Sequence, residues 1–311
     1  MKSFKKPLLL SIKQIDSTDL RFNIFESDLT GYHFADSVIL QNTGRVYRIL
    51  YGFEILTANL EPDYRFPALC LSEKLPLVEI LEIIVTVQRR KRELFPIETA
   101  RIIHLACQSG MSDDDIVDQV FSLLHLKPDP ALIADYRQMI TLSKSMVRYL
   151  TDKHAPVKTW LNLVHRGLIG IPALDKFIQL NPTLSIFEEI TTSLFEISKR
   201  ESIRLDSLFE SLHWNGIVEK ADLEEKVRIR RIRDIILQRR FPKLSAHREQ
   251  VEKVLKQIPL PENAKLNFDE TFEKKEIQIN WRLHTPADIE RMHAFFNDET
   301  VRRLKILLNT L

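Results

Sequence analysis

Two clusters of basic side chains are the residues of this 311-residue chain best suited to chemistry, and that chemistry is phosphate binding. The first cluster is Arg89, Arg90, Lys91 and Arg92. The second contains eight basic residues: Lys226, Arg228, Arg230, Arg231, Arg233, Arg239, Arg240 and Lys243. Such a stripe can bind nucleic acid electrostatically with little sequence preference. The competing interpretation is a solvated helix face that pairs with the nearby Glu224, Glu225 and Asp234.

The remaining polar residues favour neither a metal site nor a catalytic centre. His104 and Cys107 lie one helical turn apart, a spacing that could place two metal ligands side by side. Because no second pair accompanies them, we predict that they pack in or near the core and that no metal is bound. Three aspartates follow Ser112 and are interpreted as the first turn of a capped helix. No Ser/His/Asp or Cys/His grouping stands out.

Composition narrows the function classes further. The net charge is +2 with 28% charged residues, so any nucleic-acid contact must come from a local cluster. The chain has seven glycines and neither a G-x-x-x-x-G-K nor a G-x-G-x-x-G pattern, which disfavours P-loop ATPases and dinucleotide oxidoreductases. Two cysteines without a C-x-x-C pair, and no run of about 18 apolar residues, indicate a cytoplasmic protein without a membrane partner.

The first basic cluster follows a region whose apolar residues alternate. Residues 46–51 have the period of a strand and end at Gly52, where a residue without Cβ lets the backbone turn sharply. A helix is predicted to begin at Phe53. Further strands are predicted at residues 8–15, 36–41 and 66–71. These segments together predict a small α/β unit.

The rest of the chain reads as helical except for one hairpin. From Leu75 the apolar period becomes helical and remains so to about Leu212, with Pro96 at the start of one helix and Gly110 after its end. Beyond the second basic cluster we predict a helix at 245–258, strands at 265–268 and 276–283, and a helix capped by Thr285.

The order of these segments resembles the amino-terminal half of the ParB family of partition proteins. In that family a strand-glycine-helix junction, written L-I-x-G-E-R-R-x-x-A, holds the triphosphate of CTP. The segment from Arg45 to Ala58 keeps the glycine and the apolar frame of this motif but neither arginine. The second family motif, E-N-x-Q-R followed by L-x-P-x-E-E-A, is matched by Gln88 and Arg89 and by residues 94–100, with Val-Thr in place of Glu-Asn.

The resemblance implies an α+β fold with three domains. These are a small mixed-sheet ParB/sulfiredoxin-like domain at 1–74, a helical domain at 75–212, and a carboxy-terminal α/β domain with a β-hairpin at 213–311, through which the protein would dimerise. It also implies a degenerate nucleotide pocket with CTP and Mg²⁺ as the expected ligands. The residues that would form this pocket are Gly52, Glu54, Gln88 and Arg89.

The helical domain resembles the family's helix-turn-helix only in part. Residues 110–120 match its first helix, whereas the segment from Ala131 to Leu142 follows two prolines and carries Asp135, which would repel phosphates. We therefore expect contact with DNA phosphates more than with base edges. The predicted DNA-contacting residues are Arg90, Lys91, Arg92, Arg137, Lys144, Arg148, Arg230 and Arg233.

The function implied by the resemblance is that of a non-enzymatic, DNA-associated partition or regulatory protein in the cytoplasm, associated with the nucleoid. A homodimer and a ParA-like ATPase partner are expected with it. Two alternatives remain open. One is a nucleotide-dependent enzyme on the same fold, with phosphotransfer, CTPase or nuclease activity. The other is a protein-interaction module that has lost both ligands.

Overall fold

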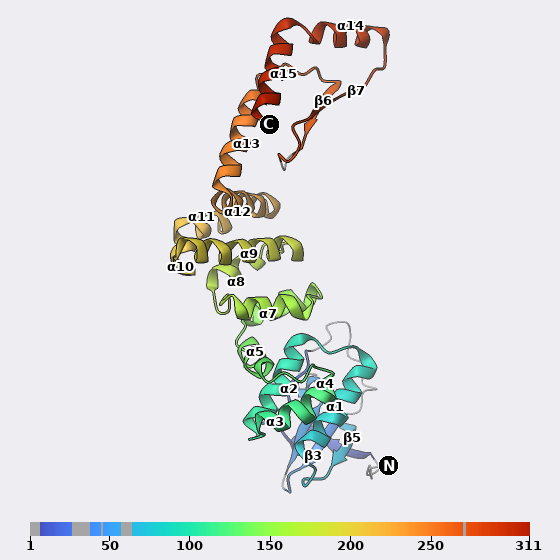
Figure 1. The fold of residues 1–311 in the computed structure, drawn as a ribbon. Helices are drawn as coiled ribbons and strands as arrows, with labels where there is room; N and C mark the ends of the chain where they lie inside the picture. The colour runs from blue at the N-terminus through green and yellow to red at the C-terminus, as the bar shows by residue number, and fades with distance from the viewer. Residues whose placement is uncertain (1–6, 27–37, 45, 57–63, 270–271) are drawn as a thin grey trace. The chain divides into compact units, whose positions relative to one another are not determined.

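The computed structural model describes residues 7–26, 38–44, 46–56, 64–269 and 272–311 (Figure 1). The chain divides into two compact units, residues 1–191 and 192–311. The first contains a five-stranded mixed sheet, the second a two-stranded sheet, and both are otherwise mainly helical. The predicted α+β class is therefore confirmed. The finer division into domains at 1–74, 75–212 and 213–311 stays a prediction.

The strand order of the first sheet is β1-β5-β3-β4-β2. Its strands are β1 (Leu8–Ser11), β2 (Ile15–Asp16), β3 (Val38–Asn42), β4 (Tyr47–Tyr51) and β5 (Arg65–Leu71). The β1–β5 and β3–β4 pairs are antiparallel, whereas β3–β5 and β2–β4 are parallel. Leu40, Ile49 and Phe66 lie in the core of this sheet. Of the two segments that carry the family resemblance, the first thus contributes a strand, β4, to this mixed sheet.

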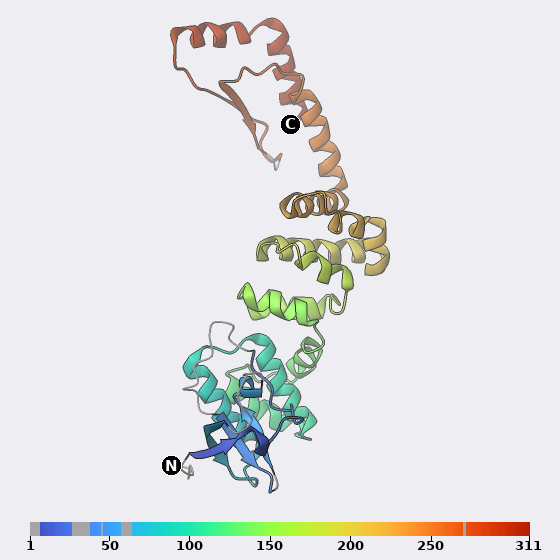
Figure 2. The same ribbon diagram turned by 180° about the vertical axis from the view of Figure 1, so that it is seen from behind.

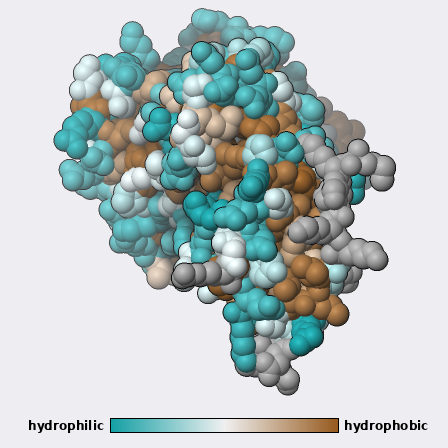
Figure 3. Space-filling model, turned by 90° about the horizontal axis from the view of Figure 1, so that it is seen from below, coloured by the Kyte–Doolittle hydropathy of each residue, from teal (hydrophilic) through white to brown (hydrophobic). Residues whose placement is uncertain are grey.

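The edge strand β1 exposes apolar side chains. Leu8 and Leu9 of this strand are both exposed. Figure 3 shows hydrophobic side chains, in brown, reaching the surface between hydrophilic ones on one face of the molecule. Because β1 has only four residues, its capacity for pairing with another chain is small.

Two predicted elements differ from those observed. The strand predicted at 8–15 is interrupted by a 3-10 turn, η1 (Ile12–Gln14), because the side chain of Gln14 accepts the backbone N–H of Ser11 at 3.0 Å. The helix predicted from Phe53 is a 3-10 turn, η2 (Phe53–Leu56), that follows Gly52 at a φ of +87°. Arg45, residues 36–37 and residues 57–58 of the predicted elements lie outside the described residues.

Helices of the first unit begin where the local signals predict. The helix α1 (Leu77–Lys91) packs against β4, and α2 (Pro96–Gln108) begins at its proline. Ser112 caps the next helix by accepting the N–H of Asp115 at 3.1 Å, which confirms the predicted cap. The segments after α2 are α3 (Asp113–Asp115), the π-helical η3 (Ile116–Phe121), α4 (Ser122–Leu124), α5 (Ala131–Met139), α6 (Lys144–Asp152), α7 (Val157–His165) and α8 (Pro172–Ile178).

The second unit packs helices and the predicted hairpin around its own core. Its elements follow α9 (Leu184–Glu201), which contains the boundary between the units. They are α10 (Leu205–Ser211), α11 (Trp214–Val218), α12 (Glu225–Arg240), α13 (Pro242–Leu255), β6 (Ala264–Phe268), β7 (Ile277–Trp281), α14 (Pro286–Phe295) and α15 (Asp298–Thr310), seen from behind in Figure 2. Val251, Phe295 and Leu307 are buried together, and inward residues of the hairpin pack against them. Among the described residues, the helices are too short or too polar to cross a membrane.

Candidate functional site

The two segments of the family resemblance meet where β4 ends. The hydroxyl of Tyr51, the last residue of β4, donates a hydrogen bond to Oε1 of Gln88 at 2.9 Å. Gln88 is only 4% exposed, and the ammonium of Lys91 lies 5.1 Å from the centre of the Tyr51 ring. The structure therefore brings Gln88 beside the residue that precedes Gly52. Glu54 is half-buried on the following 3-10 turn.

Arg89 contacts a different element. Its Nη1 donates to the backbone carbonyl of Leu123, in α4, at 2.9 Å. Its Nε is buried and has no hydrogen-bond partner within the described part of the chain. The structure thus places Gln88 and Arg89 on two different contacts: one joins α1 to β4, and the other joins α1 to α4.

Arg92 forms a buried ion pair. Its guanidinium donates to both carboxylate oxygens of Glu98, at 2.9 and 2.7 Å, and to the carbonyl of Glu26 at 3.2 Å. Glu98 is fully buried and also accepts the backbone N–H groups of Glu26 and Phe95. This network ties Glu26, in the segment before β3, to the start of α2. The guanidinium of Arg92 is therefore occupied by this network, whereas Arg90 is exposed.

The basic residues predicted to contact DNA in the segment from 131 to 148 are exposed. Arg137 lies on α5, and Lys144 and Arg148 lie on α6. The Nε of Arg148 is 3.7 Å from a carboxylate oxygen of Asp152, one turn further along the helix. The structure leaves all three basic groups accessible to a phosphate.

His104 and Cys107 are both half-buried on α2. Burial lowers the pKa of His104, and the charge of Arg137 adds to this effect. Burial also raises the pKa of the Cys107 thiol. Both shifts favour the neutral forms at pH 7. No group of three or more metal-ligating side chains is found in the described part of the chain.

The second basic cluster separates into two sets on α12. Ile229, Ile232 and Ile236 are buried and fix the rotation of the helix. One set of arginines is turned toward neighbouring segments: Arg228 donates to the carbonyl of Val218, Arg239 pairs with Glu201 at 2.7 Å, and Arg240 pairs with Glu196 at 2.7 Å. The other set is exposed and comprises Lys226, Arg230, Arg231 and Arg233.

Sequence reasoning named Arg230 and Arg233 as contacts but not Lys226 or Arg231. The missing signal was the helical phase of the isoleucines, because it shows which basic residues share the exposed side. No protein-family profile and no curated protein sequence matches this chain. The candidate sites accordingly rest on the residues themselves and on their geometry.

Proposed function

We propose that this protein is a ParB-like, DNA-associated partition or regulatory factor that binds backbone phosphates through one face of α12. The observation that carries the proposal is the joint exposure of Lys226, Arg230, Arg231 and Arg233, which form the basic face of α12. Phosphate contacts of this kind are electrostatic and carry little sequence information.

Ion pairing decides between a DNA-binding face and a merely solvated one. The arginines at the end of α12 pair with acidic neighbours and do not form a DNA-binding face, since Arg239 and Arg240 each have a carboxylate partner. Lys226, Arg230 and Arg231 form no ion pair with another described residue. Exposed cations without a carboxylate partner remain available for phosphates.

The dimensions of the basic face suit a duplex. Successive members of the set Lys226, Arg230 and Arg233 are four and three residues apart, so the three lie on the same side of the helix. From the first to the last of them α12 rises about 10 Å, a length along which duplex DNA presents about six phosphates. The exposed acids of the same helix, Glu225 and Asp234, are outnumbered two to one by the basic face.

The ParB/sulfiredoxin fold of the first unit is part of the same proposal. It is supported by the order of the motifs and by the Tyr51–Gln88 hydrogen bond, which joins them. Binding of CTP and Mg²⁺ at Gly52, Glu54, Gln88 and Arg89 stays a prediction, and the contact of Arg89 with Leu123 does not favour it. A homodimer and a ParA-like ATPase partner are predictions as well.

The test is equilibrium binding of the full chain to a fluorescent duplex of arbitrary sequence, measured by anisotropy over a range of salt concentrations. The double variant Arg230→Gln, Arg231→Gln removes two charges from the basic face of α12. We expect its affinity to fall about ten- to a hundredfold at low salt, and the slope of log K against log salt to fall by about 2.

The matched control is Lys274→Gln, Lys275→Gln, which removes the same charge from exposed positions before β7. It should bind almost as tightly as the unmodified protein. Equal losses in the two double variants would show a nonspecific charge effect and count against the basic face of α12. A protein without any salt-dependent DNA complex would be better described as a protein-interaction module.

A further inference from the structure

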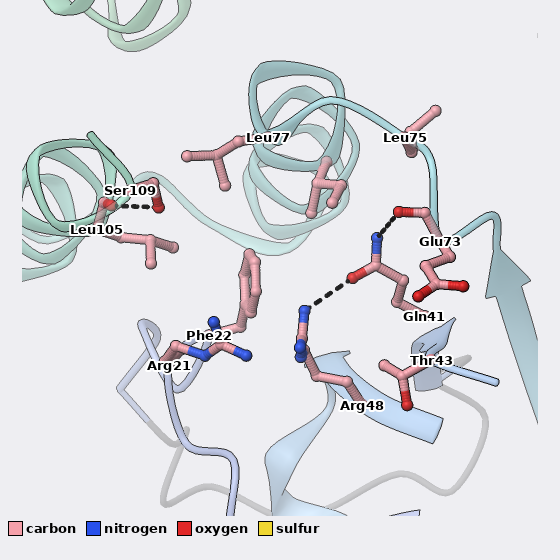
Figure 4. Close-up of a pocket in the computed structure, with 11 residues that line it drawn as sticks. Arg21, Phe22, Gln41, Thr43, Arg48, Glu73, Leu75, Leu77, Leu105 and Ser109 are labelled. Carbon is pink, nitrogen blue, oxygen red and sulfur yellow. Dashed lines mark hydrogen bonds between the residues drawn. The ribbon is translucent and has the colours of Figure 1, made fainter. Parts of the chain in front are cut away.

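A separate pocket lies at the opposite end of α1 from Gln88. It has a volume of about 300 Å³ and lies between the sheet, the start of α1 and the end of α2 (Figure 4). Leu77, at the start of α1, lines it. Since Leu77 and Gln88 are separated by about 16 Å along the helix, this pocket is distinct from the predicted nucleotide site.

One carboxylate holds two arginines together at this pocket. Asp19 accepts hydrogen bonds from Arg21 Nε at 2.9 Å, from Arg21 Nη2 at 2.6 Å and from Arg48 Nε at 2.6 Å. Arg21 and then Arg48 hold the pKa of Asp19 well below its usual range, so this carboxylate stays charged at neutral pH. Two guanidinium groups therefore share one negative charge.

The position of Arg48 is fixed from a second side. Its Nη1 donates to Oε1 of Gln41 at 3.1 Å, and the amide nitrogen of Gln41 donates to the carbonyls of Ser72 and Glu73 at 3.3 Å each. Gln41 is itself buried. Figure 4 shows the Arg48 guanidinium at the centre of the pocket, with Gln41 on one side. Such preorganisation lowers the cost of binding an anion.

The donors that remain can reach a ligand. Among the described residues, Arg21 Nη1 and Arg48 Nη2 have no hydrogen-bond partner. The side chain of Arg21 is 56% exposed, so a ligand can reach it, whereas that of Asp19 is only 12% exposed. Glu73 also lines the pocket, but it forms no ion pair with either arginine. The opposite wall is apolar and includes Phe22, Leu77 and Leu105.

We propose that this pocket binds a small monocarboxylate with an apolar body. The two arginines supply guanidinium donors in the planar arrangement that suits a carboxylate. A ligand with one negative charge is favoured over one with two, because Asp19 and Glu73 together already balance the charges of the two arginines. The apolar wall accommodates the body of the ligand, and the volume is at the small end of ligand sites.

The experiment is isothermal titration of the full chain with phenylacetate, phenylacetamide and inorganic phosphate at low ionic strength. Phenylacetate should bind saturably with a dissociation constant of about 1 mM or below. The amide has the same shape without the charge, so it should bind at least about tenfold more weakly. Phosphate should also bind more weakly than phenylacetate.

The variant is Arg21→Gln, whose exposed position tolerates the change, and the matched control is Arg65→Gln. Arg65 is an exposed residue of β5 that does not line the pocket. Arg21→Gln should weaken phenylacetate binding about tenfold, while Arg65→Gln should leave it unchanged. Any one of four results would overturn the proposal. These are a failure of phenylacetate to bind saturably, equal binding of phenylacetamide, tighter binding of phosphate, and equal losses in the two variants.

Discussion

Glu98 shows most clearly what a single residue contributes to this fold. Its carboxylate is completely buried, and it accepts hydrogen bonds from the guanidinium of Arg92 and from the backbone of Glu26 and Phe95. A buried charge is tolerated only when it is paired and hydrogen-bonded in this way. The two acceptor oxygens thereby join a loop near residue 26 to the start of α2.

Replacing Glu98 by Gln should destabilise the first unit by about 3 kcal/mol, because Arg92 would keep its largely buried position without a counter-charge. The measurement is the free energy of unfolding in urea, followed by circular dichroism. Glu93→Gln is the control, since Glu93 is exposed and close in sequence. A loss below about 1 kcal/mol for Glu98→Gln would contradict the role assigned to the pair.

At the scale of elements, side-chain hydrogen bonds attach helices to neighbouring strands. Asp288, in the first turn of α14, accepts the backbone N–H groups of His284 and Thr285 at 2.8 Å each. Its other oxygen accepts a hydrogen bond from Asn263, the residue before β6, at 3.1 Å. One carboxylate thus caps α14 and ties that helix to the hairpin.

The stability of the second unit should depend on the charge of Asp288. The N–H groups of His284 and Thr285 lower the pKa of Asp288 to about 2, below its value of about 3.9 in an unfolded chain. Its contribution is therefore complete above about pH 4 and is lost as the pH falls toward 2. Unfolding midpoints measured from pH 5 to pH 2 should fall less steeply for Asp288→Asn than for the unmodified protein.

The control for this prediction is Glu290→Gln, which changes an exposed acid on the same helix. It should retain the acid sensitivity of the unmodified protein. A pH profile for Asp288→Asn that coincides with that of Glu290→Gln would remove Asp288 as the source of the acid effect.

The contact between α1 and β4 gives a second prediction at this scale. Because the hydroxyl of Tyr51 donates to the buried Gln88, the variants Tyr51→Phe and Gln88→Leu should be coupled by about 1 kcal/mol in a double-mutant cycle of urea unfolding. The pair Tyr47→Phe and Thr86→Ala, which changes the same two elements away from this hydrogen bond, should show no coupling. Additive effects of Tyr51→Phe and Gln88→Leu would mean that the hydrogen bond contributes nothing to stability.

At the scale of the whole molecule, the local signals in the sequence predicted most of the elements. Pro96 begins α2, Ser112 caps the next helix, and the hairpin strands lie within a few residues of their predicted limits. Caps, proline positions and apolar periods act over a few residues, so a single sequence contains them. The 3-10 turns at Ile12 and Phe53 were missed because they are decided by individual side-chain bonds and by backbone geometry.

The sites were less predictable because their partners are distant in sequence. Arg89 contacts a carbonyl 34 residues away, and Arg92 contacts one 66 residues away. Nothing near Arg21 in the sequence indicates that it shares Asp19 with Arg48, a residue of β4. The number of basic residues is therefore a poor guide to how many of them can bind a ligand.

The sequence by itself determined the α+β class, the places where many helices begin, and the presence of two basic clusters, since each depends on residue type and short spacing. Only the tertiary structure decided which basic groups are committed to carboxylates and which face solvent. The physical reason is that a buried or half-buried charge must find a partner wherever the fold supplies one. Arg92 pairs with Glu98, whereas Arg230 and Arg231 remain exposed on α12.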